Sequence, residues 1–504
     1  MSTYKLIAFL GIVLIISGCS IFGGGFSTKE PLNMEQELST DARYLLDDAF
    51  NLAPSKLKPE LVDHHFHLIG NGQTISDVCP SIDLSDVPSV PDDTNLKTWL
   101  NKGRFSWGDP IGKIKTSVLM NTVKVENKNN ADVESVQRVL ELVEGLVKGK
   151  NGYNFRVHLL AVDGYYEAPK KNDFYIKTGR SQFVEAKTDL VIPNWYTIKL
   201  AECLNGKFKH RKPFVPVISI NPYRADALIR LDELKDKARY IKWVAPSQGF
   251  DPSNPLIKPF YQKVKELGMV IMSHTGDEHA FNVMDESTRE FGNPLLMRNA
   301  LDMGIPVILS HAGGDDVKNF EGQRLSDVGD QAHAKKHRHG LPLSHEYRNH
   351  WNFMKMMLDE KNKNNWCLFG DISALTLDKN FQHFKALMGA QKDQLQYRLL
   401  YGSDYPLAAS RFLFPLGGLI KQGYLHPSLE ASLEELFSYN PLAFDIAVKR
   451  NLNHPDSNDW LTNLPKETFM SVEENIRREK KITSFKGVKR QACFNWYKDN
   501  VGSF

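Results

Sequence analysis

Short apolar runs alternate with helical segments along most of the chain from residue 61 onward. Eight runs are dominated by Val, Ile, Leu and other apolar residues, at positions 61–68, 155–162, 214–220, 240–245, 269–273, 306–310, 367–372 and 398–402. Continuous apolar runs are typical of parallel strands that are buried on both faces, and their alternation with helices indicates βα units. Eight such units predict an α/β fold, a (β/α)8 TIM barrel.

Weaker signals complete the pattern. Ser39, Thr40 and Asp41 predict a helix start, and residues 42–52 continue with helical apolar spacing. A ninth run, at 116–123, is either a strand or the lead-in to a helix over 133–146, and we favour the second.

Two long insertions interrupt the pattern, at 69–114 after the first run and at 315–350 after the sixth. Both follow the carboxyl end of a strand, where barrel active sites are built, and long loops there often act as lids. The second insertion holds several histidines among Lys and Arg, namely His333, His337, His339, His345 and His350. Their spacing matches no metal-ligand pattern, so we predict a solvated basic loop.

The first residues of the chain predict an exported lipoprotein. Residues 6–16 form an apolar run of signal-peptide length, shorter than the roughly 20 residues of a spanning helix. The run ends in Ile-Ser-Gly-Cys, which resembles a bacterial lipobox with Cys19 as the lipidated residue. We therefore expect anchoring in a bacterial cell envelope, and Ser20 is compatible with the outer membrane, facing the periplasm, of a Gram-negative cell. The alternative is an uncleaved anchor or a buried helix.

These features divide the chain into four parts. We predict a signal peptide at 1–18, a tether at 19–38, the barrel at 39–447 and a helical or irregular C-terminal extension at 448–504.

Composition narrows the class of protein. Hydrophobic residues make up 41% and charged residues 24%, which is ordinary for a globular protein. The chain has 63 basic and 60 acidic residues, so no nucleic-acid partner is expected. Five cysteines without a Cys-X-X-Cys motif exclude a disulfide scaffold, and Cys203 and Cys367 are interpreted as buried packing residues.

Polar residues stand at the carboxyl ends of four runs. His65 and His67 are two positions apart in the first run, so a regular strand places both side chains, and that of Asp63, on one face. His274 and His311 end the fifth and sixth runs, and Asp404 follows the eighth. These ends meet at one mouth in a barrel. Histidine and carboxylate ligands together suit a divalent metal, zinc first and manganese or iron as alternatives.

The order of these residues, with the segments Leu-Ser-His-Ala-Gly-Gly, Tyr-Gly-Ser-Asp-Tyr-Pro and Asn440-Pro441, resembles the amidohydrolase superfamily, in particular its amidohydrolase-2 branch. The resemblance covers roughly residues 61–447. It implies a metal-dependent enzyme that acts on a small molecule, either a hydrolase or a decarboxylase.

The resemblance also implies roles for the individual residues. His65, His67, His274 and Asp404 would hold the metal, and Asp404 would in addition shuttle a proton. His311 would either bind a second metal or polarise a substrate carbonyl. Asp63 would hydrogen-bond a ligand histidine or, equally well, be satisfied by backbone groups.

Lys242, in the fourth run, is expected at a buried strand end. A buried lysine is unfavourable unless it is paired or neutral. In binuclear relatives a carboxylated lysine bridges two metals, whereas this branch also has single-metal sites. We favour an unmodified pocket lysine and one metal ion, with two as the alternative.

Further residues at the same ends are candidates for substrate contact: Arg224, Asp277, Glu278 and His279. Arg224 can fork to a carboxylate; helix capping and surface ion pairs are the alternatives for all four residues.

The leading hypothesis is therefore a hydrolase that uses a metal-activated water on an amide, lactone or ester bond. The alternatives are a non-oxidative decarboxylase with the same ligands and a non-catalytic binding lipoprotein. The sequence leaves the substrate and the oligomeric state open.

Overall fold

The structure is a computed structural model that describes most of the chain from residue 37 onward. The described residues are 37–52, 60–69, 78–80, 122–125, 131–148, 152–169, 175, 191–276, 278, 286–314, 335–336, 342–343, 349–358, 365–376, 383–384, 387, 395–411, 414, 416–453, 464–486 and 490–502. The predicted signal peptide, Cys19, most of the tether, most of the run at 116–123 and most of both insertions lie outside these residues.

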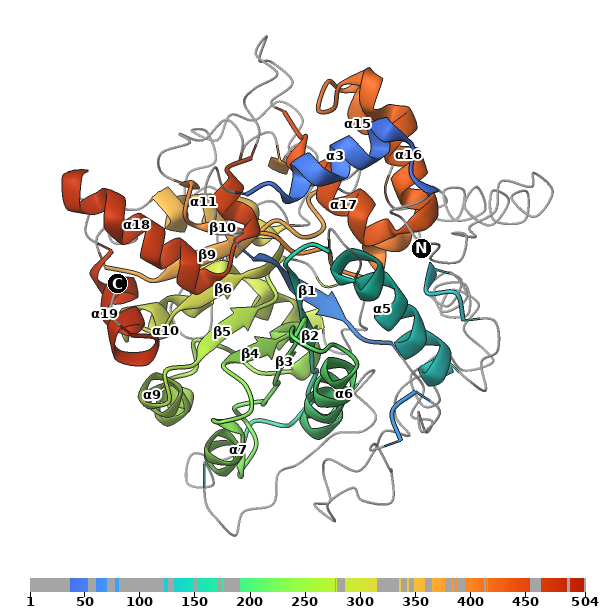
Figure 1. Cartoon of the computed structure of the whole chain (residues 1–504). Coiled ribbons are helices and arrows are strands. Elements are labelled where there is room, and N and C mark those ends of the chain that lie inside the picture. The colour runs from blue at the N-terminus through green and yellow to red at the C-terminus, as the bar shows by residue number, and fades with distance from the viewer. Residues whose placement is uncertain are drawn as a thin grey trace, which may run out of the picture.

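Eight parallel strands form the centre of the molecule (Figure 1). They are β1 (Leu61–His67), β2 (Phe155–Leu160), β3 (Phe214–Val217), β4 (Tyr240–Trp243), β5 (Val270–Ser273), β6 (Val307–Leu309), β9 (Leu368–Asp371) and β10 (Leu399–Leu400). Each lies inside one of the eight predicted runs. A short antiparallel pair, β7 (Lys335–Lys336) and β8 (Pro342–Leu343), lies between β6 and β9 in sequence.

The strands close into a barrel. Hydrogen bonds join them in two groups, β1-β2-β3 and β10-β9-β6-β5-β4. Parallel bridges between Ile218 and Ile241 and between Phe66 and Tyr405 join the two groups at both edges. The prediction of a (β/α)8 barrel is confirmed.

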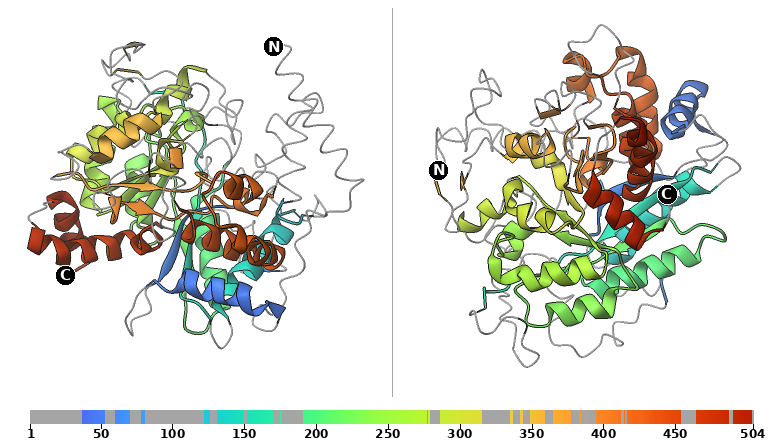
Figure 2. Two further views of the ribbon diagram at one scale, coloured as in Figure 1. Left: turned by 90° about the horizontal axis from the view of Figure 1, so that it is seen from above. Right: turned by 90° about the vertical axis from the view of Figure 1, so that its left-hand side faces the viewer.

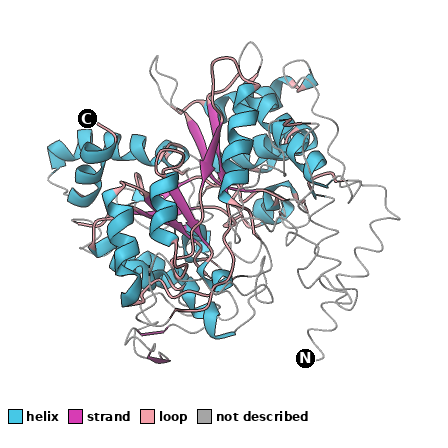
Figure 3. Cartoon of the chain, turned by 90° about the horizontal axis from the view of Figure 1, so that it is seen from below, coloured by secondary structure: helices cyan, strands magenta, loops and turns pink. Residues whose placement is uncertain are grey.

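Helices surround the strands (Figures 1 and 3). Those that follow the strands in sequence are α5 (Ala131–Val147), α6 (Asn194–Gly206), α7 (Ala227–Leu234), α8 (Ala245–Gln248), α9 (Lys258–Glu266), α10 (Arg298–Asp302) and α11 (Asn349–Leu358). After β10 come α15 (Leu416–Lys421), α16 (Glu430–Tyr439) and α17 (Pro441–Arg450). The larger apolar core lies between strands and helices, and includes Ile241 and Trp243 of β4.

The N-terminal helix α3 (Thr40–Phe50) packs beside α16 and α17 (Figure 1). The Ser39 hydroxyl caps it by accepting a hydrogen bond from the Ala42 N–H at 3.2 Å, as the sequence predicted. The Ser39 N–H and hydroxyl also donate to the Glu435 carboxylate, both at 2.6 Å. These contacts attach the start of the described chain to the last barrel helices. Among the described residues, no helix has the length and apolar character needed to cross a membrane.

The C-terminal helices α18 (Val472–Lys486) and α19 (Gln491–Asn500) extend the second core, which fills the barrel interior. That core joins Tyr240 and Met272 of the strands to Ile476 and Phe494 of the two helices. In the views of Figure 2 both helices lie against one end of the strands. The C-terminal extension is thus packed into the barrel rather than appended to it.

Two disulfides correct the prediction for the cysteines. Cys79 is bonded to Cys203, and Cys367, just before β9, is bonded to Cys493 of α19. Cys203 and Cys367 are therefore not simple packing residues. The partners are 124 and 126 residues apart, so local sequence contains no sign of the pairing.

Strand β1 departs from regular alternation. Its register with β2 shifts between Asp63 and Phe66. The His64 ring lies 4.9 Å from that of His158 in β2, which in turn lies 4.6 Å from the ring of Tyr240 in β4. Since β3 separates β2 from β4 in the sheet, these three rings meet inside the barrel.

Replacing Cys493 with Ser tests the covalent link between α19 and β9. A disulfide stabilises mainly by restricting the unfolded chain, and losing one that closes a loop of this length typically costs about 2–5 kcal/mol. We expect Cys493→Ser to lower the melting temperature relative to wild type in non-reducing buffer. Under reductant the two proteins are expected to unfold together. Equal melting temperatures without reductant would show that the link contributes nothing.

Candidate metal centre

The predicted site residues gather at the carboxyl ends of the strands. His65 and His67 come from β1, Lys242 from β4, His274 and His311 from the ends of β5 and β6, and Asp404 from the turn after β10. Glu278 joins them beside His274, whereas Asp277 and His279 lie outside the described residues.

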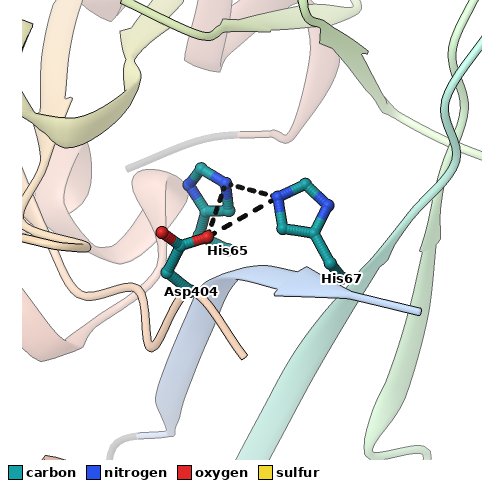
Figure 4. A group of neighbouring side chains, drawn as sticks. All are labelled: His65, His67 and Asp404. Atoms are coloured by element: carbon teal, nitrogen blue, oxygen red, sulfur yellow. Dashed lines mark hydrogen bonds and ion pairs between the residues drawn. The ribbon is translucent and has the colours of Figure 1, made fainter. Parts of the chain in front are cut away.

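Three side chains converge most closely, those of His65, His67 and Asp404 (Figure 4). The two Nε2 atoms are 3.0 Å apart, and Oδ1 of Asp404 lies 3.5 Å from the first and 3.6 Å from the second. Burial lowers the pKa of His65 to about 3 and that of His67 well below its usual value. Both rings are therefore neutral at pH 7, the form in which imidazole binds metals. A carboxylate and two neutral imidazoles at this spacing fit a divalent cation.

Asp371, at the end of β9, orients His65. Its Oδ2 lies 2.9 Å from Nδ1 of His65, and both side chains are fully buried. A carboxylate on one ring nitrogen places the proton there and leaves the other nitrogen free to bind a metal. Asp371 was not among the predicted site residues, although it lies next to the last residue of the seventh run, just as His311 follows the last residue of the sixth.

Asp404 is held at the junction that closes the barrel, where β1 pairs with the turn after β10. Its N–H donates to the carbonyl of His65 at 2.8 Å, and its φ of 55° is left-handed. Gly402 permits this approach, because a Cβ there would lie 2.6 Å from Cβ of His65. Behind the turn, Lys449 Nζ donates to the Gly402 carbonyl at 2.8 Å and to Asp445 at 2.9 Å.

The protonation of Asp404 follows from its surroundings. Burial raises its pKa to about 7, although the charge of Lys242 acts in the opposite direction. A divalent cation beside this carboxylate favours the ionised form.

Asp63 stabilises the same junction between β1 and the turn after β10 by accepting hydrogen bonds from backbone groups. Its Oδ1 accepts from the N–H of Ser403 at 2.9 Å and of His65 at 3.1 Å. Of the two roles considered for Asp63, the structure thus favours satisfaction by backbone.

His311 sits in a left-handed turn. Its φ is 59° and that of Ala312 is 48°. The His311 N–H donates to Oδ1 of Asp371 at 2.9 Å, and Nδ1 of His350 donates to the Ala312 carbonyl at 2.8 Å. His350 is fully buried, so the prediction of a solvated loop was wrong for this residue.

His274 faces His311, with ring centroids 4.9 Å apart. Its Nδ1 lies 3.4 Å from Oε2 of Glu278, a second buried carboxylate beside an imidazole. This contact places Glu278 behind a predicted metal ligand.

Lys242 is buried in β4, with 1% of its surface exposed. Its Nζ donates to Nε2 of His65 at 3.2 Å and to the Ser310 hydroxyl at 3.1 Å. Burial lowers its pKa to about 8, while the carboxylates of Asp371 and Asp404 partly offset that effect. The lysine therefore lies within the site.

Arg224 is engaged by protein groups. Its Nε and Nη2 donate to the Asp226 carboxylate at 2.9 and 3.0 Å, and its Nη1 donates to the Tyr166 hydroxyl at 2.6 Å. The structure thus gives this predicted substrate residue protein partners at the ends of β2 and β3.

Several solved structures resemble the chain. A protein assigned as a 2-pyrone-4,6-dicarboxylic acid hydrolase from Pseudomonas putida matches 69% of this chain and 84% of its own, with 12% identity and a TM-score of 0.32. A 5-carboxyvanillate decarboxylase from Sphingomonas paucimobilis matches 83% and 98%, with 11% identity and a TM-score of 0.34. Another such decarboxylase, from Novosphingobium aromaticivorans with bound manganese, matches 82% and 96%, with 10% identity and a TM-score of 0.36. At this distance the three structures indicate nothing about the substrate.

No curated protein sequence matches the chain. A family model described as Amidohydrolase matches residues 192–444, half of the chain. That segment contains β3 to β10. It includes Lys242 of β4 and, after β5, β6 and β10, the residues His274, His311 and Asp404. The chain belongs to the amidohydrolase family, whose members are metal-dependent enzymes that act on small molecules.

Proposed function

We propose that the chain is a metal-dependent hydrolase that cleaves an amide, lactone or ester bond of a small molecule. The observation that carries this proposal is the convergence of His65, His67 and Asp404, whose ligand atoms lie 3.0 to 3.6 Å apart, beside His274 and His311. When bound, a divalent cation supplies a hydroxide at neutral pH by lowering the pKa of water to about 7.

The protein's own groups complete the chemistry. Asp404 is positioned to accept a proton from the attacking water and to return it to the leaving group, as a general acid–base does. Lys242 remains largely protonated at pH 7, since its pKa is about 8. As a point charge it fits an anionic group of the substrate.

One zinc ion is the proposed content of the site. The second possible ligand set, His65, His311 and Asp371, shares His65 with the first. Because Nδ1 of His65 already contacts Asp371, this ring has only Nε2 to offer a metal. That argues for a single ion, with Lys242 not carboxylated.

A decarboxylase with the same ligands is the alternative within the family. Incubation with amides, lactones, esters and aromatic acids in 18O-labelled water separates the two reactions. A hydrolase incorporates the label into its product, whereas a decarboxylase releases carbon dioxide without incorporating it. Release of carbon dioxide with no label in the organic product would reject the hydrolase proposal.

We also propose that Cys19 is lipidated and anchors the enzyme in a bacterial cell envelope, facing the periplasm if the cell is Gram-negative. The apolar run before Cys19 motivates this proposal. Two disulfides support it, since such bonds persist mainly in oxidising compartments.

The first prediction for the site concerns metal content. Wild type is expected to hold one equivalent of zinc per chain by elemental analysis. His67→Ala should hold much less, because it loses a ligand, whereas His210→Ala, at an exposed histidine, should match wild type. Equal zinc in the His67 variant would reject this residue as a ligand. Two equivalents in wild type would reject the single-metal site.

Asp404→Asn tests the proton acceptor. Asparagine keeps an oxygen for the metal but cannot take up a proton at neutral pH. With a substrate identified as above, we expect turnover to fall at least about 100-fold. Asp236→Asn, at an exposed aspartate, should leave turnover unchanged. Near wild-type turnover in a metal-loaded Asp404→Asn protein would contradict this role.

Cys19→Ala tests the anchor. In the bacterial host, wild type is expected in the membrane fraction. The variant cannot accept the lipid and should lose this association. A variant that is cleaved yet remains in the membrane fraction would refute lipidation at Cys19.

A further inference from the structure

Ser373 follows β9 and links two imidazoles to one carboxylate. Its hydroxyl contacts Oδ1 of Asp371 closely, lies 2.9 Å from Nδ1 of His311 and 3.1 Å from Nδ1 of His65. The serine is fully buried. Three polar partners thus surround a group that has a single proton to donate.

The position of that proton follows from the other contacts of Asp371. Oδ1 already accepts the main-chain N–H of His311 at 2.9 Å and of Ser373 at 3.0 Å. An oxygen that accepts two N–H groups is a carboxylate acceptor and carries no proton. The proton between Oδ1 and the hydroxyl is therefore that of the serine. Since it points at Asp371, the hydroxyl oxygen can only accept from the imidazoles.

We propose that Ser373 is a positioning residue that fixes His311 as the tautomer protonated on Nδ1, with its lone pair on Nε2. Asp371 does the same for His65 directly, through its Oδ2. One buried carboxylate thereby sets the tautomers of two histidines that come from different strands, one by direct contact and one through a hydroxyl.

The consequence for the reaction rests on the proposed function. A neutral His311 with its lone pair on Nε2 binds a metal or accepts a proton. In this form it has no N–H on Nε2 to donate to a substrate carbonyl. Of the two roles that the family resemblance implied for His311, this tautomer argues against polarisation of a substrate carbonyl. It leaves metal binding and adds a third role, that of a proton acceptor.

A matched control exists elsewhere in the chain. The Ser253 hydroxyl and N–H donate to Oδ1 of Asp251 at 2.7 and 2.8 Å, which repeats the Asp-X-Ser arrangement of residues 371–373. This pair lies in the loop between α8 and α9, where the Ser253 carbonyl accepts a hydrogen bond from Nδ2 of Asn299 at 3.1 Å. Ser253→Ala removes the same kind of hydrogen bond without touching a site histidine.

The test reads the tautomer directly. Full-length protein with 15N-labelled histidine rings is freed of metal with a chelator, and ring nitrogen shifts are recorded by NMR. His311→Gln identifies the His311 signals. We expect Nδ1–H in wild type and in Ser373→Thr, which keeps the hydroxyl, and a shift toward Nε2–H in Ser373→Ala.

The second measurement is the affinity of each protein for zinc, determined by competition with a chelator. The Ser373 hydroxyl lies 3.1 Å from Nδ1 of the proposed ligand His65, and loss of a partner behind a ligand typically weakens metal binding about 10- to 100-fold. We expect that loss in Ser373→Ala, substantial recovery in Ser373→Thr and no change in Ser253→Ala.

The proposal would be overturned if His311 in wild type carried its proton on Nε2. It would also be overturned if the Ser373→Ala and Ser253→Ala proteins had the same His311 tautomer and the same zinc affinity. If Ser373→Ala does not fold, the wild-type and Ser373→Thr spectra still decide. Absence of zinc binding in wild type would reject the proposed function, whereas the tautomer remains readable in metal-free protein.

Discussion

A charged carboxylate is stable inside a protein only where hydrogen-bond donors replace the water it has lost. Asp371 has such donors from several parts of the barrel: the main-chain N–H groups of His311 and Ser373, the Ser373 hydroxyl and the ring of His65. Removing the carboxylate would leave these donors unpaired in the interior. The rest of the site depends on this interaction because it joins the first strand to the turns after β6 and β9.

The charges of the site are balanced by burial. Desolvation is the largest influence on the pKa of His65, His67 and His311, and it keeps these rings neutral. Lys242 stays largely cationic because it is surrounded by the carboxylates of Asp371 and Asp404, with Glu278 further away. A divalent cation entering this group would meet neutral nitrogens and a carboxylate, with one competing positive charge. That competition gives Lys242 a direct influence on how tightly the metal is held.

The sequence predicted the barrel well because buried parallel strands leave continuous apolar runs, and all eight runs contain a strand. It also indicated most of the side chains that the structure brings together at the carboxyl ends of the strands, since a polar residue at the end of such a run is visible without knowing the contacts. Cys203 and Cys367 were misinterpreted because their partners are distant in the chain. The irregular register of β1 depends on packing against β2, and the role of Ser373 depends on the contacts of its hydroxyl with three side chains. Neither feature can be recognised from the spacing of apolar and polar residues in the sequence.

The bond between Cys367 and Cys493 has a consequence for the order of assembly. A chain is synthesised from its N-terminus, so β1 with His65 and His67 emerges long before α19 does. The helix α19, which packs at the amino ends of the strands, opposite His65 and His67, is therefore among the last parts available. Oxidation that couples Cys367 to an earlier cysteine would leave that end open to water. Correct closure thus requires Cys367 to be unpaired when the final helix arrives, or to be released from an earlier partner by thiol–disulfide exchange, which makes the order of oxidation part of the folding pathway.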